Sequence, residues 1–112
     1  QTCALPIFFL NEWLKIVAQK NMPLFFSGKW QKELSFNDFI MLFEYLLGDL
    51  ICVKLNQPQK NTDLDFDQLS PYYDLESLFN IYSELQQAKK LVEQNVQSQL
   101  IIDQLFITLM NI

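Results

Sequence analysis

The sequence contains no His and no Arg, and only two Cys and two Gly among its 112 residues. Without His, a Ser-His-Asp triad, a Cys-His pair and an imidazole metal site are all excluded. Cys3 and Cys52 are too few and too far apart for a thiolate zinc site, and they do not indicate a secreted disulfide scaffold. Gly28 and Gly48 alone cannot form a glycine-rich phosphate loop. We therefore expect a cytoplasmic chain that is not an enzyme and has no catalytic residues, metal or cofactor.

Positive charge is also scarce, because eight Lys stand against 13 acidic residues and give a formal net charge of -5. The first 34 residues carry four Lys and two Glu, so the acidic excess lies in residues 35–112. An acidic body repels phosphate, and it also opposes binding to an anionic membrane surface. We expect no direct contact with nucleic acid and none with a membrane.

What the sequence does have is apolar residues, which make up 50% of the chain and include ten Phe. This fraction argues against disorder, and the length suits a single domain over residues 1–112. The apolar run at the start is too short to span a membrane. Because the chain begins with Gln1, we expect it to be a fragment of a longer protein.

Hydrophobic periodicity of three to four residues predicts helices rather than strands. The segment at 21–34 is ambiguous and is interpreted as a short helix or turn, and residues 63–73 as a short helical turn. The predicted fold is all-α, a compact bundle of about five helices. Its four clear helices run over about 7–20, 36–55, 74–94 and 98–110.

The helix at 36–55 is the most apolar, and we expect it to be central and packed on two sides. Ser35 is its predicted N-cap. Gly48 in its interior predicts a close crossing with another helix, and Cys52 is interpreted as a buried structural thiol. Glu44 and Asp49 diverge around the helix and are interpreted as solvated or interface charges.

The alternating acids Asp63, Asp65 and Asp67 resemble the start of a calcium-binding loop. Gln68 occupies the position that needs Gly for the sharp turn, and Pro71 lies within the loop. Calcium binding is therefore not expected.

Large aromatic residues are dense near the N-terminus. Core packing explains most of them, but a chain of this size cannot easily bury every large apolar side chain, and exposed apolar patches mark contacts. The candidate subunit interface consists of Phe8, Phe9, Trp13, Phe26 and Trp30.

Two strings resemble the C-terminal segment of bacterial clamp-loader subunits. Residues 88–106, AKKLVEQNVQSQLIIDQLF, are similar to a long helix that ends in an Asn-Val-Asn-type break before a Gln-Leu-x-x-Glu-x-Leu helix. Residues 45–55, YLLGDLICVKL, are similar to a central helix with an Arg-Asp-Leu-Leu stretch and a following Lys. The sequence departs from the pattern at Gln97, Asp103 and Gly48, where the family has Asn, Glu and commonly a basic residue. The resemblance covers about residues 35–110 and is nearest to the delta-prime type of DNA polymerase III subunit.

The resemblance implies a collar domain, the helical C-terminal part that holds clamp-loader subunits together while the sliding clamp is loaded during DNA replication. Its partners would be the tau/gamma and delta subunits, and the N-terminal ATPase-type module would be absent from this chain. Asn95 and Gln97 would satisfy backbone groups at a helix–helix corner, and Asp103 would place charge in the first turns of the last helix. Uncovered apolar flanks would allow the isolated domain to self-associate.

An alternative is a helical ligand-binding domain, such as the effector half of a transcriptional regulator. That function requires an internal apolar cavity with a few convergent polar groups. The many aromatic residues permit such a cavity, but no pattern in the sequence indicates the polar groups.

Overall fold

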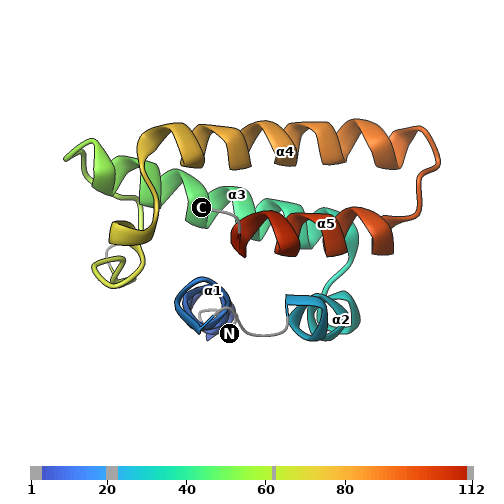
Figure 1. Ribbon diagram of the computed structural model, residues 1–112, viewed down its shortest axis with the longest axis horizontal. Helices are drawn as coiled ribbons and strands as arrows, with labels where there is room; N and C mark the ends of the chain where they lie inside the picture. The colour runs from blue at the N-terminus through green and yellow to red at the C-terminus, as the bar shows by residue number, and fades with distance from the viewer. Residues whose placement is uncertain (1–3, 20–22, 62, 111–112) are drawn as a thin grey trace.

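Five α-helices and one short 3₁₀ helix form the part of the chain that the structure describes (Figure 1). This computed structural model describes residues 4–19, 23–61 and 63–110. No strand occurs in these ranges, so the predicted all-α class is confirmed. The elements are α1 (Ala4–Gln19), α2 (Pro23–Glu33), α3 (Phe36–Lys54), η1 (Ser70–Tyr72), α4 (Leu75–Glu93) and α5 (Ser98–Met110).

The helices form two groups that cross each other. Helices α3, α4 and α5 run along the long axis of the molecule, whereas α1 and α2 are seen end-on below them in Figure 1. Helix α5 packs against α1, α2 and α4, and α3 packs against α1, α2, α4 and η1. The hydrophobic core therefore lies between the two groups, and α3 is central as predicted.

Helix ends follow signals that are local in the sequence. The Ser35 side chain accepts a hydrogen bond from the Asp38 N–H at 3.2 Å, which confirms the predicted N-cap of α3. Asn56 and Asn95 adopt left-handed backbone angles, with φ of 57° and 67°, directly after the C-cap residues of α3 and α4. After each Asn, the next N–H returns to a carbonyl five residues earlier, as in Gln57 to Cys52 at 2.8 Å. Each helix thus ends in a Schellman motif, in which Asn takes the position usually held by Gly.

The ambiguous segment at 21–34 contains a full helix, α2, rather than a brief turn. Pro23 is its first residue, where the missing N–H costs nothing. Ser27 and Gly28 do not interrupt it, because Ser27 is buried and hydrogen-bonded to α5. Packing against α5 outweighs the weak helix propensity of these two residues.

Aromatic rings from four helices meet at the centre of the core. The ring of Phe9 in α1 lies with its centroid 5.1 Å from Trp30 of α2, 5.3 Å from Phe43 of α3 and 6.2 Å from Phe106 of α5. All four side chains are at most 2% exposed. This aromatic cluster joins helices that are distant in the sequence.

Asp74 is the N-cap of α4, and its carboxylate accepts a hydrogen bond from the Ser77 backbone N–H at 2.8 Å. This bond holds the pKa of Asp74 below its usual value, with a smaller contribution from Lys54. A carboxylate with a lowered folded-state pKa stabilises the fold above its unfolded pKa of about 3.9, and this stabilisation is lost as pH falls through the folded pKa. We expect Asp74→Ala to lower the melting temperature at neutral pH and the difference to become smaller in acid, where the protonated side chain keeps only a neutral hydrogen bond. Thermal unfolding followed by circular dichroism from neutral to acidic pH measures the difference in melting temperature. A difference that does not change with pH would contradict the link between the Asp74 charge and stability.

Candidate functional site

Most of the predicted N-terminal interface lies in the core instead of on the surface. Phe9, Trp13 and Trp30 are at most 2% exposed, so in the folded chain their side chains cannot meet a partner. Phe8 is 56% exposed and remains a candidate contact. The side chain of Phe26 lies outside the part that the structure describes. Periodicity alone could not separate these residues, because Phe8 and Phe9 are adjacent and equally apolar.

The predicted helix junction is formed by the connection between α4 and α5. Asn95 supplies the left-handed residue of the Schellman motif, and its N–H bonds to the Val92 carbonyl at 3.2 Å. The Gln97 carbonyl accepts hydrogen bonds from the N–H groups of Leu100 and Ile101 and so opens α5. These bonds use the backbone atoms of the two residues, so a role of the Asn95 and Gln97 side chains at this corner stays a prediction.

Asp103 has a different role from the one expected. It lies in the second turn of α5, whose first turn contains no acidic residue, so the helix dipole does not account for it. Its carboxylate accepts hydrogen bonds from the Ser27 hydroxyl and from the Gln31 amide of α2. Asp103 thus fixes α5 to α2.

The outer side of α3 carries an uncovered apolar stripe. Met41, Tyr45, Gly48, Cys52 and Leu55 recur at spacings of three and four residues, so they lie on one side of the helix. Met41 is 66% exposed, Tyr45 39% and Leu55 46%. Cys52 is a free thiol that is only partly buried, which corrects the prediction of a buried one.

Gly48 lies exposed in the middle of this stripe. A Cβ added there would meet no atom within 4 Å, so the predicted crossing with another helix of the chain is wrong. Gly in a helix interior destabilises the helix by about 1 kcal/mol relative to Ala. No contact within the described residues offsets this loss.

Helix α4 extends the apolar stripe. It runs antiparallel to α3 beside it (Figure 1), and Glu44 of α3 forms an ion pair with Lys89 at 2.7 Å and accepts a hydrogen bond from Gln86 at 2.6 Å. Phe79, Tyr82, Gln86 and Lys89 recur at spacings of three and four residues, so they lie on the side of α4 that meets Glu44. Because the helices are antiparallel, Phe79 and Tyr82 lie toward the C-terminal half of α3. We call this surface the α3–α4 face. It consists of Met41, Tyr45, Gly48, Cys52 and Leu55 with Phe79 and Tyr82.

The α3–α4 face is large enough to indicate a binding surface. Its five large side chains are between 39% and 66% exposed and together present on the order of 500 Å² of mostly apolar area. Patches of this size on small proteins often mark contacts with other molecules. An open groove of about 580 Å³, lined by Phe36, Ile40, Met41, Val92 and the Glu44–Lys89 pair among others, continues the face toward the start of α3.

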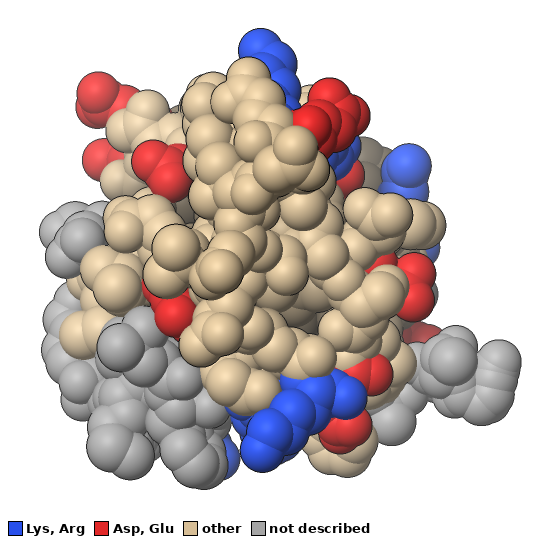
Figure 2. All heavy atoms as spheres, turned by 90° about the vertical axis from the view of Figure 1, so that its right-hand side faces the viewer, with Lys and Arg blue, Asp and Glu red and all other residues tan. Residues whose placement is uncertain are grey.

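A neighbouring surface is also poor in charge at its centre. Figure 2 looks onto the end of the bundle that carries the α4–α5 connection, and there Lys, Asp and Glu side chains gather toward the margins. Leu100, near the start of α5, is 59% exposed. Depletion of charge at the centre of a surface with charge at its rim is typical of protein interfaces.

Two carboxylates are buried, and one of them, Asp49, differs from what the sequence predicts. Asp49 is 2% exposed, and its oxygens accept hydrogen bonds from the N–H groups of Lys60 at 2.8 Å and Asn61 at 3.1 Å, so it is not the solvated or interface charge that was expected. Glu12 is 7% exposed and accepts hydrogen bonds from the Trp30 indole and the Lys29 ammonium. Both roles are structural. A carboxylate among apolar neighbours on a helix is the only signal of them in the sequence.

The three acids of the calcium-like pattern do not converge. Asp63, Asp65 and Asp67 are exposed, and Asp65 accepts a hydrogen bond from the Asp67 N–H at 2.9 Å in a local turn. Leu64 and Phe66, which alternate with them, are buried. Within the described ranges, no three His, Cys, Asp or Glu side chains are grouped so that they could hold a metal ion.

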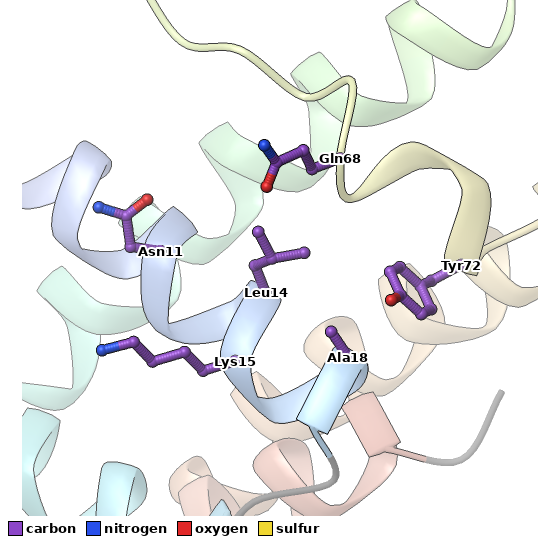
Figure 3. A pocket seen from close by; sticks show the side chains of 6 residues that line it. All are labelled: Asn11, Leu14, Lys15, Ala18, Gln68 and Tyr72. Carbon is purple, nitrogen blue, oxygen red and sulfur yellow. The ribbon is translucent and has the colours of Figure 1, made fainter.

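A hollow on another side of the molecule is lined by both polar and apolar side chains. It lies between α1 and the segment that leads into η1, has a volume of about 640 Å³, and opens to solvent. In Figure 3, Leu14 and the Gln68 amide border the hollow and the Tyr72 ring turns toward it, whereas the Lys15 ammonium points away from Tyr72. This open, partly polar depression is not the enclosed apolar cavity that an effector-binding domain would need.

Among the described helices, none combines the length and the apolar character that crossing a membrane requires. Comparison of the chain with protein-family models, with curated proteins and with solved structures gives no match.

Proposed function

We propose that this chain is a helical assembly domain, the collar of a bacterial clamp-loader subunit of the delta-prime type. In this role it holds neighbouring subunits together while the sliding clamp is loaded onto DNA. The observation that carries the proposal is the α3–α4 face, a broad apolar surface that the rest of the described chain leaves uncovered. Such a face suits docking of a helix from another protein.

Three further features support an assembly role. The two strings that resemble clamp-loader subunits lie on α3 and on the α4–α5 corner, and the α3 string contributes four residues to the α3–α4 face. Asn95 takes the left-handed position of the Schellman motif between α4 and α5, where the resemblance implies a break between two helices. The acidic body of the chain leaves contacts with DNA to other modules.

The partners would be the collar domains of the tau/gamma and delta subunits in the cytoplasm. To test this, the purified chain is mixed with purified tau/gamma and delta collars, and complex formation is followed by size-exclusion chromatography with light scattering. We expect a complex that is weakened at least about tenfold by Phe79→Glu, because a charge would be buried in the contact.

Gln87→Glu is the matched control, because Gln87 is an exposed residue of α4 outside the α3–α4 face. This control is expected to bind like the unmodified chain. Phe8→Glu is measured in the same assay, because Phe8 is the exposed residue of the predicted N-terminal interface. Absence of any complex with either collar would rule out the clamp-loader role.

A further inference from the structure

We propose that the α3–α4 face also binds a second copy of this chain, with the two α3 helices crossing at Gly48. The resulting dimer has two-fold symmetry, so the same surface is used by both copies. This inference goes beyond the clamp-loader role and does not depend on it.

The first observation is the position of Gly48. It stands inside a long helix, is exposed, and has open space above it, although Ala would favour the helix. Its apolar neighbours on the stripe are Tyr45 and Cys52. A glycine at the centre of an apolar stripe lets the backbone of another helix come close, which a side chain would prevent.

The second observation is the symmetry of the stripe about Gly48. Met41 lies seven residues before Gly48 and Leu55 seven residues after it, while Tyr45 and Cys52 lie three before and four after. A two-fold axis through Gly48 with antiparallel helices places Met41 against Leu55 of the second copy. It also places the large Tyr45 ring beside the small Cys52 side chain of the second copy. The stripe is therefore complementary to itself in size.

The third observation is the absence of unpaired charge at the centre of the face. The residues that make up the face are uncharged, and Glu44 beside them is already paired with Lys89. A second copy therefore brings no like charges together at the crossing point. The net charge of -5 on each copy is largely screened over a Debye length of about 8 Å at physiological salt.

The exposed area limits the size of the dimer interface. With on the order of 500 Å² of apolar surface on each copy, the interface buries roughly 1,000 Å² in total, which is at the lower limit for specific protein interfaces. We therefore expect a reversible dimer whose fraction increases with concentration, not an obligate one.

Sedimentation equilibrium over a concentration series tests the proposal with a pair of glycine variants. Gly28 is the control, because it is also an exposed glycine inside a helix where an added Cβ would meet no atom within 4 Å, but it lies on α2. We expect both Gly→Ala variants to raise the melting temperature of the monomer. Only Gly48→Ala is expected to weaken dimerisation, by about tenfold or more, because its methyl group keeps the two helices apart.

A cross-linking experiment tests the same contact in a second way. In a Cys3→Ser background, Tyr45→Cys places a thiol next to Cys52 of the second copy, and mild oxidation with oxidised glutathione should give a covalent dimer. Gln87→Cys introduces a thiol outside the α3–α4 face and is expected to give much less covalent dimer. Equal cross-linking of both variants, a chain that stays monomeric at all concentrations, or equal dimerisation of the two glycine variants would overturn the proposal.

Different results would exclude the dimer and the clamp-loader role. If the chain stays monomeric but binds tau/gamma or delta collars through the α3–α4 face, the second-copy proposal is overturned and the clamp-loader role stands. If the chain dimerises as described but binds neither collar, the clamp-loader role is ruled out and the dimer stands.

Discussion

Replacing Trp13 by Ala is expected to lower the free energy of unfolding by about 3–5 kcal/mol. Trp13 is fully buried in α1, and its ring centroid lies 5.3 Å from that of Phe43 and 5.9 Å from that of Tyr73. Ala would leave a cavity where α1 meets α3 and the segment after η1, and the surrounding helices can close it only in part. Urea unfolding followed by circular dichroism measures the loss.

The size of this effect separates a core role for Trp13 from the interface role that the sequence predicts. A surface contact residue would change stability by less than about 0.5 kcal/mol when truncated, while binding to a partner would fall. A small change in stability for Trp13→Ala would therefore contradict the position of Trp13 in the core.

Trp13→Phe isolates the hydrogen bond of the indole from its packing. The Trp13 Nε1–H donates to the Tyr73 hydroxyl at 2.8 Å, and that hydroxyl donates to the Leu109 carbonyl at 2.7 Å, so α1, the segment after η1 and α5 are joined. Burial raises the pKa of Tyr73 far above its usual value, which keeps the hydroxyl protonated and able to donate. We expect Trp13→Phe to destabilise the fold by about 1–2 kcal/mol, clearly less than Ala does.

Replacing Asp49 by Ala is expected to destabilise the fold by about 2 kcal/mol or more, because two backbone N–H groups lose their acceptors. These groups belong to Lys60 and Asn61, in the loop that follows α3. The carboxylate that holds them is 2% exposed. The loop is expected to loosen first, which hydrogen exchange at Lys60 and Asn61 would show as faster exchange than in the helices.

Asp49→Asn provides the matched control. Asn has nearly the same shape as Asp and keeps one acceptor oxygen, so we expect about half of the destabilisation that Ala causes. A wild-type-like stability of Asp49→Ala, or unchanged exchange at the two loop amides, would contradict the role of Asp49 as the support of this loop.

The residues at the helix ends show why much of the fold could be predicted. Ser35, Asp74, Asn56 and Asn95 act through hydrogen bonds to backbone groups three residues away. Such signals are complete within a short stretch of sequence, so they need no knowledge of the rest of the fold. The exception is α2, because Pro23 is as well suited to begin a helix as to follow the end of one, and the sequence does not distinguish the two.

The candidate site was less predictable, because burial depends on partners far away in the chain. Phe8 and Phe9 are neighbours of the same type, yet Phe8 is 56% exposed and Phe9 is 1% exposed among rings of α2, α3 and α5. Met41 and Phe43 on α3 differ in the same way. A helix that is apolar on most of its circumference does not reveal which side its neighbours cover.

By itself the sequence determined the helical class, the approximate positions of four helices and the residues that cap α3 and α4, because these depend on periodicity and on capping bonds between near neighbours. Only the tertiary structure decided that Trp13 and Asp49 are buried, that Asp103 binds α2, and that the apolar stripe around Gly48 is left uncovered. The physical reason is that these outcomes are set by contacts between segments as much as 76 residues apart. Hydrophobic attraction has no direction of its own, so packing alone selects which apolar surface is enclosed and which stays open to a partner.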